Sequence, residues 1–186
     1  MFFDVDGFNW CTDTKRNRYV NCFSENCHAG FWDANHPGQG EIGYNKLISC
    51  IAVGHRSNGF QIKGGDTVTD CTSKNNANNG IQADSDCIIL GGKCFDDQET
   101  KTQDYGIKIA GNNTTVIGAD CRGNLVGSIL NNGANNNIKD CKGFVNENSG
   151  TAEASNNDWI THGLKATSNV VTLTNMNATY DSVPVI

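Results

Sequence analysis

Several features that mark other protein classes are missing from this 186-residue sequence. No apolar run approaches the ~18 residues of a membrane-spanning helix, so we expect no membrane span. The chain has 14 Lys and Arg against 20 Asp and Glu, and its net charge of −6 argues against a nucleic-acid binder. It has only two prolines. Its apolar residues show no helical period, and this excludes helical repeats.

The spacing of the cysteines fits neither a zinc-binding site nor a disulfide framework. The chain has nine cysteines but no C-x-x-C pair, and the pair Cys22 and Cys27 has no matching second pair. Buried free thiols that pack as small hydrophobic groups explain the pattern without a bond or a metal.

A repeat fills the middle of the chain. Short apolar segments follow glycine four times, at residues 59–62, 80–83, 106–109 and 127–130, and each is followed by a second apolar segment that ends on cysteine. The distances from glycine to cysteine are 12, 14, 15 and 14 residues, and those cysteines, Cys71, Cys94, Cys121 and Cys141, lie 23, 27 and 20 residues apart. Self-similarity with a period of about 20–30 residues indicates a solenoid.

The segments are too short for helices, so the repeat predicts an all-β fold, a parallel β-helix of about six coils. Stacked coils place equivalent residues in columns at the ~4.8 Å spacing of paired strands. We expect Phe31, Phe60, Ile81 and Ile107 in one inward column and Asn58 above or below Asn79 at a tight turn. We expect one further inward column of thiols, formed by Cys50, Cys71, Cys94, Cys121 and Cys141.

The residues Thr115 to Asn124 (TVIGADCRGN) and Gly127 to Gly133 (GSILNNG) carry a family resemblance. They resemble the right-handed parallel β-helix repeats of the pectate-lyase-like superfamily, and in particular the last coils of phage tail-appendage and tailspike-like proteins. The resemblance implies a right-handed coil. It also implies that the segment His162-Gly163-Leu164 opens a small β-rich module after the helix.

The chain therefore divides into coils over residues 1–150 and a small C-terminal β-rich cap or linker over residues 151–186. The opening and the apolar ending at Ile186 lead us to expect a piece of a longer protein or an end buried against a neighbour. Together with the tailspike-like repeats, the apolar tail predicts a homotrimer. The resemblance places such a protein in a virion tail or appendage, or on an extracellular surface.

Alternation of side chains along the post-glycine strands predicts a carbohydrate-binding stripe. Trp32, Gln61, Gln82 and Lys108 should share one outward column, and Lys63 and Asp84 the next, with Ala34 and Ala110 at its ends. An enlarged loop, residues 34–46, should form a wall at one end. A ring face for stacking, together with amides for hydrogen bonding, suits a polysaccharide or surface glycan.

The sequence identifies no catalytic residues. Glycosidases need two carboxyl groups about 5–10 Å apart, and no such pair stands out. The catalytic patches of pectate lyases and polygalacturonases are absent. We expect no cofactor. Asp84 and Asp86 leave Ca²⁺ as the alternative, although the remaining ligands of a calcium loop are missing. Two hypotheses remain, a structural glycan-binding module of a phage appendage or surface fibre, and a polysaccharide lyase, hydrolase or epimerising enzyme.

Overall fold

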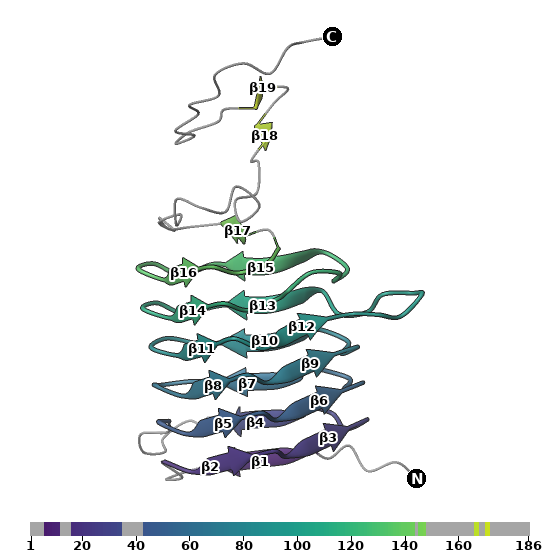
Figure 1. Cartoon of the computed structure of the whole chain (residues 1–186), viewed down its shortest axis with the longest axis vertical. Coiled ribbons are helices and arrows are strands. Elements are labelled where there is room, and N and C mark those ends of the chain that lie inside the picture. Colours follow the sequence, from purple (N-terminus) through teal and green to yellow (C-terminus); the bar gives the residue numbers. More distant parts are fainter. Residues whose placement is uncertain are drawn as a thin grey trace.

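The computed structural model describes residues 6–11, 16–34, 43–143, 145–147, 166–167 and 170–171. These residues form strands and no helix, so no described segment could cross a membrane as a helix. The strands stack into a parallel β-solenoid of about five turns (Figure 1). This architecture confirms the predicted fold class, an all-β parallel solenoid. The hand of the coil stays a prediction.

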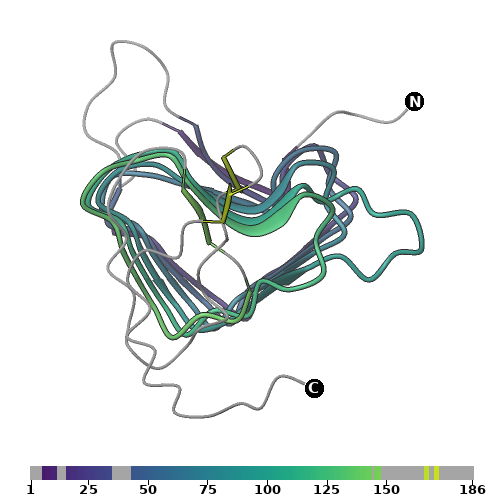
Figure 2. The ribbon, with the colours of Figure 1, turned by 90° about the horizontal axis from the view of Figure 1, so that it is seen from above.

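The largest sheet takes one strand from each successive coil, and all its pairings are parallel. Its seven strands are β1 (Phe8–Cys11), β4 (Phe31–Ala34), β7 (Phe60–Ile62), β10 (Asn79–Ala83), β13 (Tyr105–Ile109), β15 (Gly127–Asn131) and β17 (Val145–Glu147). Figure 2 is a view along the axis of the solenoid and shows that the coil has three sides. The side formed by the seven-stranded sheet curves inward.

Two smaller parallel sheets form the other sides. The six-stranded sheet contains β2 (Arg18–Val20), β5 (Lys46–Ile48), β8 (Thr67–Thr69), β11 (Ile88–Leu90), β14 (Thr115–Ile117) and β16 (Asn137–Lys139). The four-stranded sheet contains β3 (Phe23–Glu25), β6 (Ile51–Val53), β9 (Thr72–Lys74) and β12 (Lys93–Phe95). The coils that begin with β1, β4, β7 and β10 visit the three sheets in the same order, and the coils that begin with β13 and β15 add strands to the two larger sheets only.

The predicted inward column of large apolar residues is confirmed beneath the seven-stranded sheet. The ring centroids of Phe8 and Phe31 lie 4.7 Å apart and those of Phe31 and Phe60 4.8 Å apart, with nearly parallel planes. These distances match the spacing of paired strands, so the rings stack from coil to coil. Ile81 and Ile107 continue the column and are fully or almost fully buried.

The repeated glycine has a steric cause. A Cβ atom on Gly30 would lie 2.4 Å from the carbonyl oxygen of Gly59, and one on Gly59 would lie 2.8 Å from that of Gly80. A Cβ atom on Gly80 would lie 2.5 Å from the carbonyl oxygen of Gly106. Glycine recurs here because the neighbouring coil's backbone leaves no room for a side chain.

The cysteines occupy two neighbouring columns, so the prediction of a single column is wrong. Cys94 pairs opposite Ser73, which places Gly92 opposite Cys71. The first column contains Cys22, Cys50, Cys71, Gly92, Ala119 and Cys141, and the second contains Ser24, Ala52, Ser73, Cys94, Cys121 and Gly143. All five predicted thiols are nevertheless buried and free, as the sequence indicated. Burial raises the pKa of the Cys141 thiol.

Many of the buried polar side chains lie at the corners between sheets, although Ser24 and Ser73 are buried within strands. At the corner before the seven-stranded sheet, the backbone N–H and Nδ2 of Asn79 donate to Oδ1 of Asn58 over 3.2 and 3.0 Å. The predicted amide column is thereby confirmed. The amide of Asn58 thereby accepts from the buried backbone N–H of the adjacent coil.

A second amide ladder follows the four-stranded sheet. The backbone N–H of His55 donates to Oδ1 of Asn76 over 3.1 Å, and Nδ2 of Asn76 donates to Oε1 of Gln103 over 2.8 Å. Nε2 of Gln103 then donates to Oδ1 of Asn124 over 2.7 Å. Four coils are joined by these side chains, which are buried except for the partly exposed Asn124.

A third ladder precedes the six-stranded sheet and contains an acid. The backbone N–H of Asn17 donates to Oδ1 of Asn45, and the backbone N–H of Asn45 donates to Oδ1 of Asp66 over 2.8 Å. Asp33 and Asp66 are both fully buried near this corner. Burial raises the pKa of Asp66, although the N–H groups of Asn45 and Lys63 partly offset the effect.

The C-terminal segment is described only in part. β18 (Ala166–Thr167) and β19 (Val170–Val171) pair in antiparallel fashion. The rest of the predicted cap over residues 151–186 lies outside the described residues, and so do residues 35–42 of the enlarged loop. The division into coils and cap stays a prediction.

Candidate functional site

The predicted stripe residues lie on the outward face of the seven-stranded sheet. Trp32 pairs opposite Gln61, Gln61 opposite Gln82, and Gln82 opposite Lys108. All four are partly exposed, whereas the flanking strand residues such as Phe60 are buried. The strand alternation expected from the sequence therefore brings these four side chains into one column, on the side that curves inward in Figure 2.

The indole of Trp32 has polar neighbours that the sequence did not reveal. The imidazole of His28 lies with its centroid 5.6 Å from that of the Trp32 ring, at an interplanar angle of 50°. Nδ1 of His28 lies 3.2 Å from Oδ1 of Asp6. The other carboxylate oxygen of Asp6, Oδ2, accepts a hydrogen bond from Nδ2 of Asn9. These contacts hold the imidazole against the indole, and thereby restrict the orientation of the Trp32 ring.

Asn58 orients the two glutamines of the stripe. Its Nδ2 lies 3.4 Å from Oε1 of Gln61 and 3.4 Å from Oε1 of Gln82. Because both amide oxygens face Asn58, the Nε2 groups are the ones placed to donate to a ligand. The sequence indicated Asn58 as a turn residue, and its contact with the stripe is visible only in the folded coil.

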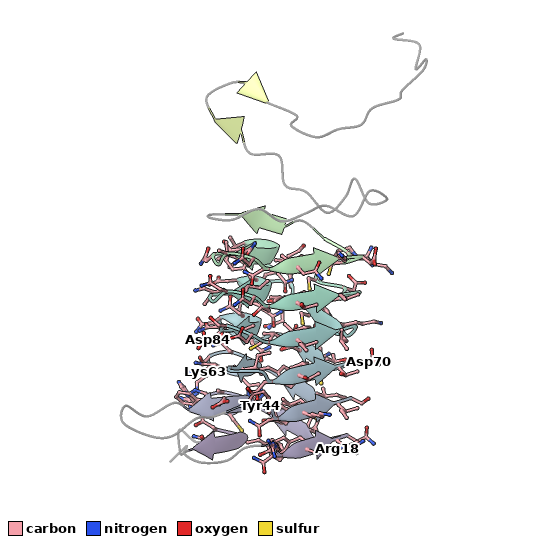
Figure 3. The ribbon with its side chains drawn as sticks, turned by 90° about the vertical axis from the view of Figure 1, so that its left-hand side faces the viewer. Arg18, Tyr44, Lys63, Asp70 and Asp84 are labelled. Atoms are coloured by element: carbon pink, nitrogen blue, oxygen red, sulfur yellow. The ribbon has the colours of Figure 1, made fainter. Side chains whose placement is uncertain are left out.

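The second predicted column brings together one pair of opposite charges. Nζ of Lys63 lies 3.8 Å from Oδ2 of Asp84 on the next coil, and Figure 3 shows both on the same side of the solenoid. Tyr44 lies on that side too, with 59% of its surface exposed and its ring against Gly65. Ala34 ends β4, and Ala110 follows β13 in the same column.

The polar stripe ends above Lys108. The next residue in its column is Leu130, which is only 8% exposed. The stripe therefore extends over four coils, from Trp32 to Lys108, with an aromatic ring at one end and a cation at the other.

A Ca²⁺ ion beside Asp84 and Asp86 stays a prediction. Asp84 faces Lys63, and Oδ1 of Asp86 accepts from Nδ2 of Asn113 over 3.2 Å. Among the residues that the structure describes, no three His, Cys, Asp or Glu side chains gather as they do around a metal ion. Neither Asp84 nor Asp86 belongs to such a group.

The arrangement is chemically suited to holding a sugar chain. An aromatic face covers the apolar side of a pyranose ring, and amide groups bond to its hydroxyls. The six predicted residues include one carboxylate, Asp84, whereas hydrolysis of a glycosidic bond needs two carboxyl groups at a fixed separation.

Comparison with models of known families, with curated proteins and with solved structures finds no match for this chain. The fold itself defines the class of protein, an all-parallel β-solenoid. Membership of the pectate-lyase-like superfamily and the likeness to phage tailspikes stay predictions from the sequence.

Proposed function

We propose that the chain is a structural and glycan-binding β-helix module of a phage or prophage tail appendage or of an extracellular surface fibre. The observation that carries this proposal is the outward column Trp32, Gln61, Gln82 and Lys108 on the inward-curving sheet. A rigid solenoid presents these groups at a fixed spacing of about 4.8 Å per coil. Such a surface binds an extended polymer without needing to close around it.

A variant that removes the ring and one amide tests this proposal. A polysaccharide panel first identifies a ligand from its chemical-shift changes in the intact protein. Trp32→Ala combined with Gln61→Ala is expected to abolish these changes while leaving the β-type circular dichroism spectrum intact. Thr69→Ala combined with Ile88→Ala, on the six-stranded sheet, serves as the control and should bind normally. Normal binding by the Trp32 variant would place the glycan elsewhere.

The alternative function is a polysaccharide lyase, glycoside hydrolase or epimerising enzyme. Incubation of the protein with the same panel, followed by assays of reducing ends and unsaturated uronates, separates the two functions. We expect binding without product, because Asp84 is the sole carboxylate among the six stripe residues. Product formation that is lost in Asp84→Asn would favour the enzyme.

We also propose that the chain assembles as a homotrimer. Apolar side chains are exposed along the corner between the six-stranded and four-stranded sheets, namely Val20, Phe23, Ile51, Leu90 and Ile117. Exposed apolar side chains gathered at one corner favour association. Light scattering should give about three times the mass of one chain. Phe23→Ser combined with Ile51→Ser should lower that mass, whereas Leu125→Ser, at an exposed site elsewhere, should not.

A further inference from the structure

At the corner between the seven-stranded and the six-stranded sheet, each coil has one residue with a positive φ angle. Each of these residues stands two positions before a strand of the six-stranded sheet, and because those strands pair in register the residues form one column. Glycine, asparagine and aspartate adopt this left-handed conformation readily, whereas it strains a bulky side chain. The column contains Arg16, Tyr44, Gly65, Asp86, Asn113 and Asn135, with φ angles between 58° and 87°.

Tyr44 is the aromatic member of this column, at a φ angle of 59°. Its ring lies against the next coil, where the column position belongs to Gly65. A Cβ atom on Gly65 would lie 2.9 Å from Cε1 and 3.0 Å from Cδ1 of Tyr44, so any larger residue there would displace the ring. The missing side chain of Gly65 therefore gives the Tyr44 ring its place on the backbone of the neighbouring coil.

This position does not bury the ring. Tyr44 is 59% exposed, the largest value among the exposed large apolar residues that the structure describes. The ring thus contributes little to the core, and an asparagine, as at positions 113 and 135 of the same column, would form the turn without the strain. A ring that a glycine accommodates and that stays open to solvent is suited to stacking on a ligand.

The charged side chains of this corner are balanced in number. The column and the residues just before it carry two cations, Arg16 and Lys63, and two carboxylates, Asp84 and Asp86, all at least partly exposed. Nζ of Lys63 lies 3.8 Å from Oδ2 of Asp84, and Oδ1 of Asp86 accepts from Nδ2 of Asn113 over 3.2 Å. Figure 3 shows the Lys63–Asp84 pair on the same side of the solenoid as the ring. A surface without excess charge favours a neutral ligand, whose hydroxyls can bond to the paired charges.

We propose that the ring of Tyr44 is a second stacking platform of the glycan-binding surface and takes a neutral pyranose unit on its open face. The hydroxyls of that unit bond to Lys63 and Asp84, which form the second column of the stripe. The inference rests on the proposed glycan-binding function. It adds to that function one subsite, at the edge of the seven-stranded sheet, and the charge of the ligand.

The probe for this subsite is cellopentaose, a neutral β-1,4-linked glucose oligomer whose ring faces are apolar because its hydroxyls are equatorial. The acidic comparison is β-1,4-linked pentaglucuronate, which has the same linkage and a carboxylate at each C6 position. Titration of the full chain followed by NMR should shift the ring signals of Tyr44 to saturation with cellopentaose. Pentaglucuronate should bind at least about threefold more weakly, because the chain is acidic and this corner offers no excess cation.

Three variants locate the binding. Tyr44→Asn removes the ring, and its affinity for cellopentaose should fall at least about tenfold because the apolar area of the ring is lost. Its urea denaturation midpoint should stay equal or rise, because asparagine suits the left-handed conformation. Tyr44→Phe keeps the ring face and should bind within about twofold of the unaltered chain. Leu125→Asn, at a side chain that is 55% exposed elsewhere on the solenoid, is the control and should bind normally.

The inference is overturned if cellopentaose does not bind, if pentaglucuronate binds at least as tightly, or if Tyr44→Asn binds cellopentaose normally. An equal loss of affinity in Tyr44→Phe would refute stacking on the ring face. A denaturation midpoint that falls together with the affinity in Tyr44→Asn would show a structural role instead.

These failures are distinguishable from a failure of the proposed function. If Trp32→Ala combined with Gln61→Ala abolishes binding and Tyr44→Asn does not, the glycan-binding function stands and this subsite is wrong. If no member of the polysaccharide panel shifts any signal of the intact protein, the glycan-binding function itself is wrong, and the subsite with it.

Discussion

Two kinds of column run through the interior of the solenoid, and they make different demands on the sequence. Beneath the sheets, apolar side chains stack on side chains, as in the run from Phe31 to Ile107. At the corners, amides bind the backbone of the next coil, as Asn76 does with His55. The apolar columns contribute most of the buried area and accept any residue of fitting volume. The corner ladders contribute less area, and each position needs a specific acceptor.

Removing a ring from an apolar column should have the largest effect. Phe60 is fully buried and stacks on Phe31. Phe60→Ala is expected to lower the free energy of unfolding by about 3–5 kcal/mol, because it leaves a cavity between two coils. Urea denaturation followed by circular dichroism measures the loss. Leu125→Ala, at a side chain that is 55% exposed and lies outside the proposed trimer surface, is the control and should cost little. Similar losses for both variants would refute the stacked core.

Removing one amide from a corner ladder should cost less. Asn76→Ala leaves the backbone N–H of His55 without its acceptor, whereas Oε1 of Gln103 loses the side-chain donor and keeps the backbone N–H of residue 76. Each buried group that loses its partner costs about 1–3 kcal/mol. Asn78→Ala changes the same residue type at an exposed position and should stay within about 0.5 kcal/mol. A denaturation midpoint unchanged in Asn76→Ala would show that the ladders are not structural.

The acid in the third ladder should make stability depend on pH. Burial raises the pKa of Asp66, so the folded chain holds this proton more tightly than the unfolded chain does. Its contribution to stability is present below the ordinary Asp pKa of ~3.9 and is lost as the pH rises through the folded value. Asp66→Asn, which places at this position the amide that Asn45 has, is expected to be more stable than the unaltered chain at pH 7.

Urea midpoints between pH 4 and pH 7 measure this effect, and the variant should lack the decline seen in the unaltered chain. Asp70→Asn, at an exposed carboxyl on the outside of the coil (Figure 3), should keep the decline. Equal pH profiles for Asp66→Asn and the unaltered chain would contradict the prediction.

The smallest effect distinguishes the two thiol columns. Cys94 lies in the column of Ser73, whose hydroxyl donates to the carbonyl oxygen of Gly80 over 2.7 Å. Cys94→Ser can form the equivalent bond and should change the unfolding free energy by less than about 0.5 kcal/mol. Cys71→Ser places a hydroxyl in the apolar column of Cys50 and should cost about 1 kcal/mol or more. An equal loss of unfolding free energy in the two variants would instead support the single column of thiols that the sequence predicted.

The repeat was sufficient to predict the fold, the inward column and the outward stripe, because strand alternation is local. It was insufficient for the exact register. Spacing alone aligned Cys94 with Cys71, whereas the pairing of Lys93 with Thr72 puts Gly92 opposite Cys71. Counting from glycine failed again in a later coil, where Ile129 pairs with Ile107 and Ser128 takes the glycine position.

The neighbours of the stripe were beyond prediction for a different reason. Asn58 reaches Gln82 from a separation of 24 residues, and His28 reaches Trp32 with Asp6 behind it. Such contacts depend both on how the coils stack and on where each side chain points. The spacing of residues in the sequence predicts only how the coils stack.

One coil of the rod contains 21 residues, since His55 bonds to Asn76 and Asn79 to Asn58 across that same interval. A tandem duplication of such a segment would lengthen the rod by one step of about 4.8 Å and leave every existing neighbour in place. The length of the solenoid can thus change in steps of one coil, without changes to the surfaces of the coils already present.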